Sequence, residues 1–385
     1  MRKKRVLHLY KELIPSARLC GHSQMEFLAT QGLIEYRYYP VDNVRKEALD
    51  WAEIVVLCRL DNTYERRLAQ LLKKSRKSII YVIDDDLLNI PAELSSGAYY
   101  AKAEIQANIR SMMAMSDALI SPSPILLSKY AKNNTKGILL EEPAIDPIPY
   151  MPHDLNKPVR IGFAGSTDRT GDIERILKEA LLRIKQEYGK SIELVFYGAI
   201  PSFAAELEAE CVQYNASYEE YRRTMNALQL DIGLAPMPDT AFHACKHYNK
   251  FIEYAAANTV GVFSDIGPYK RLSEVCGWEL LCDNTTDDWY VRIKWLLDNP
   301  MELNAAKQKV AMLVGTQFSI KRIATALWEE LQKLPAKRQQ QRIRMLDLQI
   351  IRGAALCRRL LAGIKRRVLN GTMAEMLQRV DLWKK

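Results

Sequence analysis

Residues 230–269 constrain the fold of this chain more than any other stretch, because they read as one complete strand–helix–strand unit. The short apolar segments 231–235 and 260–264 predict two buried strands. A loop with two prolines and a helix ending near Asn258 lie between them. Strands joined through a helix pair in parallel, so we expect an α/β protein with a parallel sheet.

The helix expected inside this unit carries three charged side chains. Lys246, Lys250 and Glu253 stand at positions i, i+4 and i+7, which predicts that they share one helical face. Both lysines fall in the first half of the helix, where the helix dipole disfavours cations unless an anion is bound. Two interpretations stay open: a phosphate site, or a solvated face with an ion pair between Lys250 and Glu253.

Length and composition favour two domains and an appendage in the reducing interior of a cell. The chain has 385 residues, more than one core usually holds. It has no apolar run long enough to cross a bilayer, and residues 1–5 (MRKKR) lead into a strand rather than a signal-peptide core. None of its seven cysteines has a short metal-binding spacing. We therefore expect free thiols, no metal site and a cytoplasmic protein.

Candidate site residues of the N-terminal half follow its predicted strands. Strands are expected at 5–10, 34–39, 54–57, 78–83 and 118–121, with helices between them. Ligands bind where parallel strands end, which selects Arg59, Asp85, Asp86 and, after the first strand, His22. The run from Asp84 to Asp86 has three possible roles: a helix N-terminus, a divalent-metal site, or carboxylates that bind a sugar hydroxyl or orient Arg59.

A proline-rich passage at 142–158 is the best domain boundary, and it predicts domains at 1–150 and 151–334. The second domain opens with a strand at 159–163 that leads into Gly165 and Ser166, and a helix begins near Asp172. Glycine lets backbone N–H groups approach a phosphate, although the same residues also suit a plain tight turn. The pattern matches neither a P-loop nor a dinucleotide fingerprint.

With these segments in order, the chain resembles retaining GT-B glycosyltransferases, of the family 4-like type that builds bacterial surface polysaccharides. The resemblance is carried by Gly165 and Ser166, and by residues 231–254 and 264–269 (SDIGPY). In the N-terminal half it is carried by 55–59 (VVLCR) and 81–91 (YVIDDDLLNIP). It covers most of residues 1–334 and none of the tail.

The resemblance implies two Rossmann-like domains with a UDP- or GDP-sugar donor between them. Lys250 and Lys246 would neutralise the departing diphosphate, so that no cofactor or metal is required. Glu253 would bind the ribose, and the backbone near Gly165 and Ser166 would contact phosphate or sugar. Asp239 has two open roles: it is the nearest acidic candidate for the donor sugar, and it equally suits the start of the helix. The acceptor side would comprise Arg59, Asp85, Asp86 and His22.

One departure from the family pattern leaves two functions open. Many relatives carry a glutamate eight positions before the one matching Glu253, and this chain has Cys245 there. The first function is sugar transfer to a glycan or lipid-linked glycan acceptor, with retention, in surface polysaccharide synthesis. The alternative is a catalytically silent protein that binds a nucleotide or glycan and assists another transferase.

The tail holds the basic character of the chain. Residues 335–385 contain 13 Lys and Arg against three Asp and Glu, while the whole chain has a net charge of +9. Interspersed Leu and Ile residues predict a basic amphipathic helix over 336–385. Such a helix suits the anionic inner face of a membrane, where a lipid-linked acceptor would lie. It could also pack on the protein or a partner; the near absence of aromatic side chains argues against nucleic acid.

Overall fold

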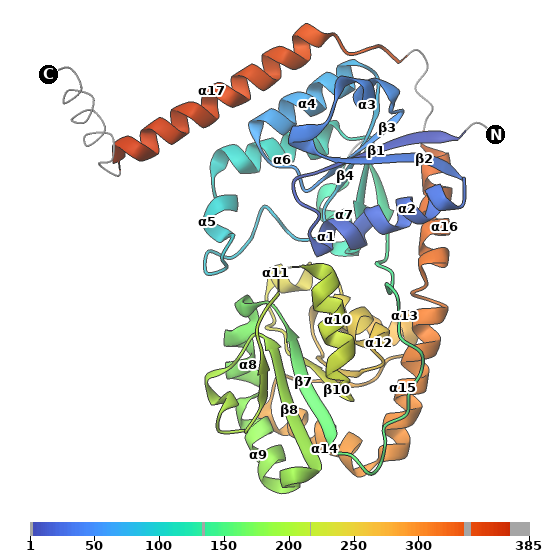
Figure 1. The fold of residues 1–385 in the computed structure, drawn as a ribbon, viewed down its shortest axis with the longest axis vertical. Helices are drawn as coiled ribbons and strands as arrows, with labels where there is room; N and C mark the ends of the chain where they lie inside the picture. The colour runs from blue at the N-terminus through green and yellow to red at the C-terminus, as the bar shows by residue number, and fades with distance from the viewer. Residues whose placement is uncertain (1–2, 133–134, 216, 335–339, 370–385) are drawn as a thin grey trace, which may run out of the picture.

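The computed structural model describes residues 3–132, 135–215, 217–334 and 340–369, and in the last helix it describes side chains up to Cys357 and that of Leu360. Two six-stranded sheets, each entirely parallel, form two units that face one another, with helices on both faces of each sheet (Figure 1). This confirms the predicted α/β class with two Rossmann-like sheets. The domain boundaries at 150 and 334 stay predictions.

The N-terminal unit has the strand order β2-β1-β3-β4-β5-β6. Its central strands are apolar and buried on both faces, as parallel strands covered by helices must be. The strands are β1 Lys4–Tyr10, β2 Ile34–Pro40, β3 Ile54–Cys58, β4 Ser78–Val82, β5 Ala118–Ser121 and β6 Lys136–Leu139. The helices are α1 Pro15–Ala17, α2 Ser23–Thr30, α3 Lys46–Trp51, α4 Thr63–Lys74, α5 Gly97–Tyr100, α6 Ala103–Met115 and α7 Pro124–Tyr130. A kinked segment, Arg18–His22, joins α1 to α2, and its Cys20 and Gly21 have non-helical backbone angles.

The C-terminal unit has the order β12-β11-β10-β7-β8-β9. Its strands are β7 Val159–Gly165, β8 Ile192–Gly198, β9 Glu210–Val212, β10 Ile232–Ala235, β11 Val260–Ser264 and β12 Leu281–Cys282. Its helices are α8 Thr170–Ile176, α9 Lys178–Tyr188, α10 Tyr218–Leu228, α11 Ala241–Ala244, α12 Asn249–Ala256, α13 Arg271–Cys276, α14 Thr286–Asp298 and α15 Pro300–Gly315. The pairing of β10 with β11 confirms the strand–helix–strand unit expected over 230–269.

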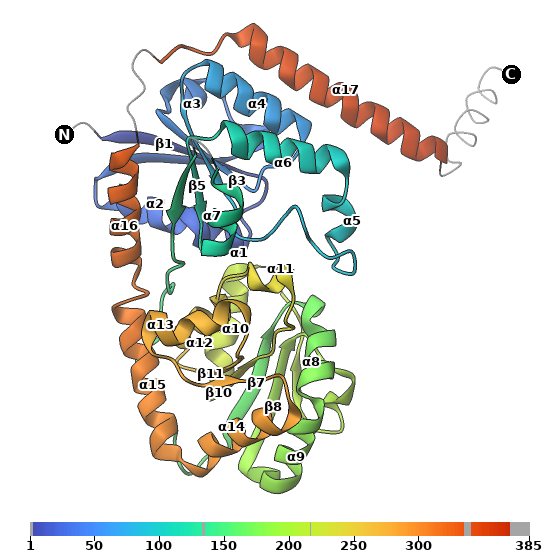
Figure 2. The same cartoon turned by 180° about the vertical axis from the view of Figure 1, so that it is seen from behind.

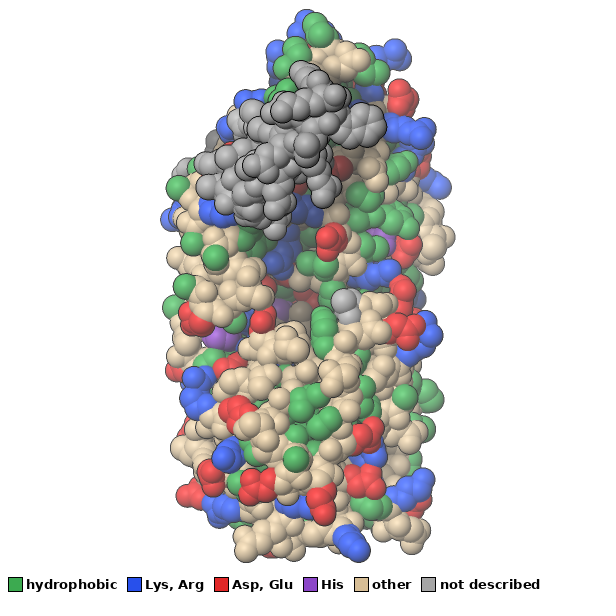
Figure 3. Space-filling model, turned by 60° about the vertical axis from the view of Figure 1, so that its left-hand side comes forward, with side chains coloured by type: hydrophobic (Ala, Val, Ile, Leu, Met, Phe, Trp, Pro, Cys, Tyr) green, Lys and Arg blue, Asp and Glu red, His purple; other side chains and the backbone are tan. Residues whose placement is uncertain are grey.

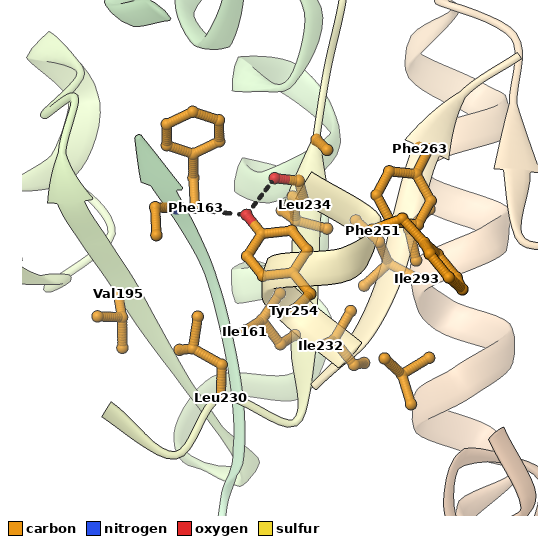
Figure 4. Close-up of a cluster of buried hydrophobic side chains, with 14 of the residues drawn as sticks. Ile161, Phe163, Val195, Leu230, Ile232, Leu234, Phe251, Tyr254, Phe263 and Ile293 are labelled. Carbon is orange, nitrogen blue, oxygen red and sulfur yellow. Dashed lines mark hydrogen bonds between the residues drawn. The ribbon is translucent and has the colours of Figure 1, made fainter. Parts of the chain in front are cut away.

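Tyr254 on α12 locks that helix to the sheet (Figure 4). Its hydroxyl donates to the carbonyl of Leu234 on β10 at 2.8 Å and accepts from the N–H of Ala164 on β7 at 3.3 Å. Its ring lies so close to β10 that a Cβ on Gly233 would stand 2.7 Å from it. Glycine at position 233 is therefore required for the ring to lie this close to β10. Together these contacts fix the distance of α12 from β7 and β10.

The chain crosses between the units a second time after α15. Ala144 of the first crossing pairs with Ser319 of the second, and the N–H of Ala144 donates to the carbonyl of Phe318 at 2.9 Å. Helix α16, Ile320–Lys333, then packs against the N-terminal unit, and its Ile323, Leu327 and Leu331 share an apolar cluster with Val6 and Ile34. The structure thus adds α16 to the core of the N-terminal unit.

Helix α17, Met345–Leu369, forms most of the described tail. Its first half lies over α4, with Ile343 and Leu348 buried in the N-terminal core, and its second half extends beyond that unit (Figures 1 and 2). Packing on the protein, one of the three alternatives for the tail, is therefore found in its first half. Residues 335–339 and 370–385 of the predicted tail lie outside the described residues. Among the described helices, none combines the length and apolar character that crossing a membrane requires.

Candidate functional site

A cavity of about 520 Å³ lies where the two sheets point their carboxyl ends at one another. The N-terminal unit contributes Arg59, Asp85 and the loop 90–96. The C-terminal unit contributes Ser166, the start of α8, and α11 with the turn that follows it. In Figure 3 the surface is hollowed between the upper and lower halves, with basic and acidic side chains around the recess. This is the position at which open parallel sheets bind ligands.

Lys246 reaches this cavity from a turn, which corrects the expectation that it shares a helix with Lys250. The chain forms two short helices, α11 and α12, and Lys246 lies between them. The break arises because His247 and Tyr248 turn inward to Glu141, whose carboxylate lies 2.8 Å from His247 Nε2 and 2.5 Å from the Tyr248 hydroxyl. Lys246 Nζ instead donates to Asp85 of the other unit at 2.8 Å.

The ion pair with Lys246 sets the charge of Asp85. Burial alone would raise the pKa of Asp85, but Lys246 and then Arg59, 3.6 Å away, outweigh it and hold that pKa well below its usual range. Asp85 is therefore ionised at neutral pH. Without a ligand, a carboxylate from one unit neutralises a lysine from the other across the cavity.

Lys250 occupies the first turn of α12, as the sequence predicts. Its Nζ lies 2.5 Å from Glu253 Oε2 and 2.8 Å from the hydroxyl of Tyr221, which itself lies 3.1 Å from Glu253. The ion pair proposed as the plain interpretation is present. The helix N-terminus still presents its positive end here, so an anion could replace Glu253 beside Lys250.

Gly165 and Ser166 end β7 beside this lysine. A Cβ on Gly165 would stand 3.6 Å from Lys250 Cε and only 2.8 Å from the ring of Phe163. A side chain at position 165 would therefore crowd both neighbours. Ser166, the next residue, is exposed and lines the cavity. The structure thus brings the glycine turn and the lysine together, although they are 85 positions apart in sequence.

The run from Asp84 to Asp86 follows β4 as an irregular turn, and the expectation that it starts a helix is wrong. Its first two carboxylates lie against Arg59: Asp84 Oδ1 is 2.7 Å and Asp85 Oδ2 is 3.6 Å from the guanidinium. Arg59 has a positive φ of 50°, a conformation that costs a non-glycine residue energy. The carboxylates therefore orient Arg59, which agrees with the third alternative considered for this run.

Asp86 points the other way, towards α7. Its carboxylate accepts from Lys129 Nζ at 2.5 Å and from Asn89 Nδ2 at 3.0 Å, and it also binds the Tyr130 hydroxyl. Consequently the three acidic side chains diverge instead of forming a cage. Within the described residues no group of three or more His, Cys, Asp or Glu side chains could hold a metal ion.

Several residues selected from sequence do not line this cavity: Gly165, Lys250, Glu253, Asp86, His22 and Asp239. His22 is buried against Tyr36, whose hydroxyl is 2.8 Å from its Nδ1, and burial lowers the pKa of the imidazole. Asp239 is exposed between Pro238 and Thr240, which both line the cavity. Thr240 caps α11, since its hydroxyl accepts from the N–H of His243 at 3.2 Å.

Three further residues at the site were not selected from sequence. Tyr221 braces Lys250 and Glu253 from α10, and His243 lines the cavity with its pKa lowered to about 4, by burial first and then by Arg169. Glu142, on the crossing between the units, is 1% exposed, and neither of its side-chain oxygens has a hydrogen-bond partner among the described residues. Burial, followed by Asp84 and Glu253, raises its pKa well above the usual range. No local pattern marks these residues, because each acts through contacts distant in sequence.

Comparison with solved structures identifies the fold of this chain. No family model matches the sequence, and no curated protein does. Solved structures match over nearly their whole length. A glycosyltransferase from Rickettsia africae ESF-5 has 14% identity over 87% of this chain and 100% of its own, with a TM-score of 0.57. Anabaena HepE, solved with UDP and glucose, has 12% identity over 86% and 99%, with a TM-score of 0.55. The chain has a GT-B fold.

The GT-B fold by itself does not fix the activity. A putative UDP-N-acetylglucosamine 2-epimerase from Listeria monocytogenes also matches, with 13% identity over 87% of this chain and 98% of its own and a TM-score of 0.51. Since one fold hosts several activities, the residues of the site determine which activity a GT-B protein has.

Cys245, at the end of α11, is buried and does not line the cavity. Its Sγ lies 3.3 Å from the carbonyl of Ala241 and 3.9 Å from Asp86 Oδ2, and burial raises the pKa of the thiol. The thiol is thus neutral at pH 7 and packs against the N-terminal core. It offers no carboxylate to a ligand.

Proposed function

We propose that this protein is a glycosyltransferase that moves a sugar from a nucleotide-sugar donor, a UDP- or GDP-sugar, to a hydroxyl of a glycan or lipid-linked glycan. We place this reaction in surface polysaccharide synthesis, with retention at the anomeric carbon. Two observations carry the proposal. Lys250, in the first turn of α12, lies beside the glycine turn at Gly165, and Lys246, four residues earlier, lines the cavity between the two GT-B units. The matched structures solved with UDP support this choice of donor.

In the proposed reaction the donor diphosphate lies at the start of α12 and replaces the carboxylates that hold the lysines without it. The bond between the sugar C1 and the phosphate oxygen breaks, and its electron pair stays on the diphosphate. Lys250 and Lys246 stabilise that charge as it develops. The acceptor hydroxyl forms the new bond to C1, and its proton passes to the departing phosphate.

The other site residues take supporting roles in the proposal. Glu253 accepts hydrogen bonds from the ribose once Lys250 turns to phosphate, and Tyr221 keeps the carboxylate in place. The backbone at Gly165 and Ser166 contacts phosphate or the transferred sugar, and Asp239 contacts that sugar from the rim. On the acceptor side we assign Arg59, Asp85, Asp86 and His22.

A catalytically silent binding protein is the second candidate, and Cys245 favours it. A buried neutral thiol stands where many relatives carry a carboxylate. Such a protein would bind the nucleotide without turning it over. Slow release of nucleotide from the donor in water, without acceptor, separates the two, since only the enzyme shows it.

A thermal-shift panel of UDP, GDP, CMP and ADP with their common sugar conjugates tests the donor site on the full chain. A nucleotide at 100 times its Kd should add about 2.7 kcal/mol to the free energy of unfolding. We expect one nucleotide to shift the native protein and Lys190→Ala, an exposed lysine of the same unit, but not Lys250→Ala. A native protein that none of them shifts would refute the donor site.

We also propose that α17 rests on the inner face of a membrane. Four large apolar side chains of α17 are 58–61% exposed: Leu346, Ile350, Leu356 and Leu360. At 100° per residue they fall within about 120° of the helix, opposite the face that packs on the protein. An exposed apolar stripe on a basic helix suits an anionic lipid surface.

A further inference from the structure

A second large groove lies on the N-terminal unit, outside the cavity between the units. Its volume is about 820 Å³, and it runs along the second half of α6 and past the end of α7. Four cationic side chains line it: Lys73 at the end of α4, Arg110 on α6, Lys129 on α7, and Lys132 just after α7. Asp117 is the one carboxylate among its described lining residues. The groove is therefore strongly cationic.

Two of these cations are left without a counterion. Lys73 lies 3.0 Å from Asp117 and Lys129 lies 2.5 Å from Asp86, so both are paired. Arg110 and Lys132 are exposed, and neither has an ion-pair partner in the described part of the chain. A groove that holds unpaired cations attracts anions.

One end of the groove adjoins the proposed donor site. Asn89 and Tyr130 line the groove, and both bind the carboxylate of Asp86. The neighbouring residue, Asp85, lines the cavity between the units and binds Lys246. A chain lying in the groove would therefore reach the cleft beside the Asp84–Asp86 turn.

We propose that this groove binds the phosphate groups of an acidic acceptor chain and guides its reacting end into the cleft. Arg110 and Lys132 bind phosphate directly, and Lys73 and Lys129 add charge from the groove wall. Naming the ligand an acceptor rests on the proposed glycosyl transfer; phosphate binding in the groove does not. The phosphate could belong to a soluble glycan or to a lipid carrier.

Titration calorimetry with inorganic tripolyphosphate, on the full chain in saturating UDP, tests the groove while the donor site is filled. We expect binding that weakens with salt and is at least tenfold weaker in the Arg110→Ala/Lys132→Ala double variant. The control, Lys190→Ala/Lys270→Ala, removes two exposed cations from the other unit and should bind as the native protein does. Equal affinity in the native protein and the groove variant would overturn the proposal.

Vesicles identify the source of the phosphate. Neutral phosphatidylcholine vesicles with and without a polyprenyl phosphate are sedimented with the native protein and the groove variant. Capture that needs both the polyprenyl phosphate and the groove cations assigns a lipid carrier, whereas groove-dependent tripolyphosphate binding alone assigns a soluble chain. If UDP does not bind, the titration is repeated on Lys246→Ala/Lys250→Ala, in which the lysines of the proposed donor site cannot bind tripolyphosphate. The two experiments can therefore refute the donor site without refuting the groove, or refute the groove without refuting the donor site.

Discussion

Each lysine of the proposed donor site is already held by a carboxylate. Lys246 is paired with Asp85 of the other unit, and Lys250 with Glu253 of its own helix. A diphosphate must therefore compete with charges that the protein supplies. The affinity for nucleotide then depends on how strongly these carboxylates hold the lysines as well as on the lysines themselves.

Replacing Asp85 with Asn should strengthen nucleotide binding, because Lys246 would then meet the diphosphate unpaired. We expect the Kd for UDP to fall two- to tenfold, about 0.4–1.4 kcal/mol, as measured by titration calorimetry. Asp86→Asn, one residue further on, is the control, because Asp86 pairs with Lys129 and points away from the cavity. An unchanged or weaker UDP affinity in Asp85→Asn would contradict the competition.

Glu142 should make the protein less stable as pH rises. Its pKa is raised in the folded state, so it stays protonated there while the unfolded chain ionises above about pH 4.3. Each pH unit between the two pKa values then costs about 1.4 kcal/mol of stability. Glu142→Gln removes this cost, so its advantage over the native protein in urea unfolding should grow from pH 5 to pH 8.

The neighbouring residue provides a control of opposite sign. Burial raises the pKa of Glu141, but His247 and Tyr248 outweigh it and lower that pKa overall. A carboxyl group whose pKa is lower in the folded than in the unfolded state stabilises the fold at every pH above its unfolded pKa. The Glu141→Gln variant should therefore be less stable than the native protein at pH 8. If both variants moved in the same direction, the explanation for Glu142 would fail.

The sequence selected Gly165 and Lys250 separately, and only the structure shows that they lie side by side. The sequence predicted the ion pair of Lys250 with Glu253, because that contact is local. It could not predict the pairing of Lys246 with Asp85, which are 161 positions apart, or the burial of Glu142 near Asp84 and Glu253, because both depend on how distant segments pack.

At the scale of elements, one hydroxyl joins α12 to two strands by hydrogen bonds, in addition to the apolar packing of the helix. Tyr254→Phe keeps the ring but leaves the N–H of Ala164 and the carbonyl of Leu234 without that partner in a buried place (Figure 4). We expect a loss of about 1–3 kcal/mol in urea unfolding. Tyr188→Phe, which removes a hydroxyl bonded to Asp298 at the surface, should change stability by less than about 0.5 kcal/mol. Equal losses in both variants would refute the attachment.

Elements were predicted well wherever apolar periodicity determines them. The central strands of both sheets lie where the sequence predicts. The short edge strands β6, β9 and β12 and the helix α16 were not predicted, and two predicted helical segments are wrong, at the break between α11 and α12 and at the turn Asp84–Asp86. Helical spacing and acidic residues suggested helices there, but contacts with Glu141, Arg59 and Lys129 override these local preferences.

At the scale of the whole molecule, the exposed stripe of α17 determines how the protein would meet a membrane. Leu346→Gln/Ile350→Gln should reduce sedimentation with anionic phosphatidylglycerol vesicles at least fivefold, because the apolar contact is lost while every positive charge remains. The control is Val291→Gln/Met301→Gln, which changes two exposed apolar side chains of the C-terminal unit. Equal sedimentation of the native protein and the α17 variant would refute the membrane contact.

The return of α16 to the N-terminal unit bears on the order in which the molecule can be made. A ribosome releases the six strands of that unit long before it releases Ile323, Leu327 and Leu331, which cover part of one face of the sheet. While the second half is synthesised, the part of that apolar face that α16 covers is therefore exposed, although α2 already packs on the rest. Expressed alone, residues 1–150 should aggregate, and a separately supplied segment 316–334 should increase the soluble fraction. The two units have separate sheets but become complete at nearly the same moment.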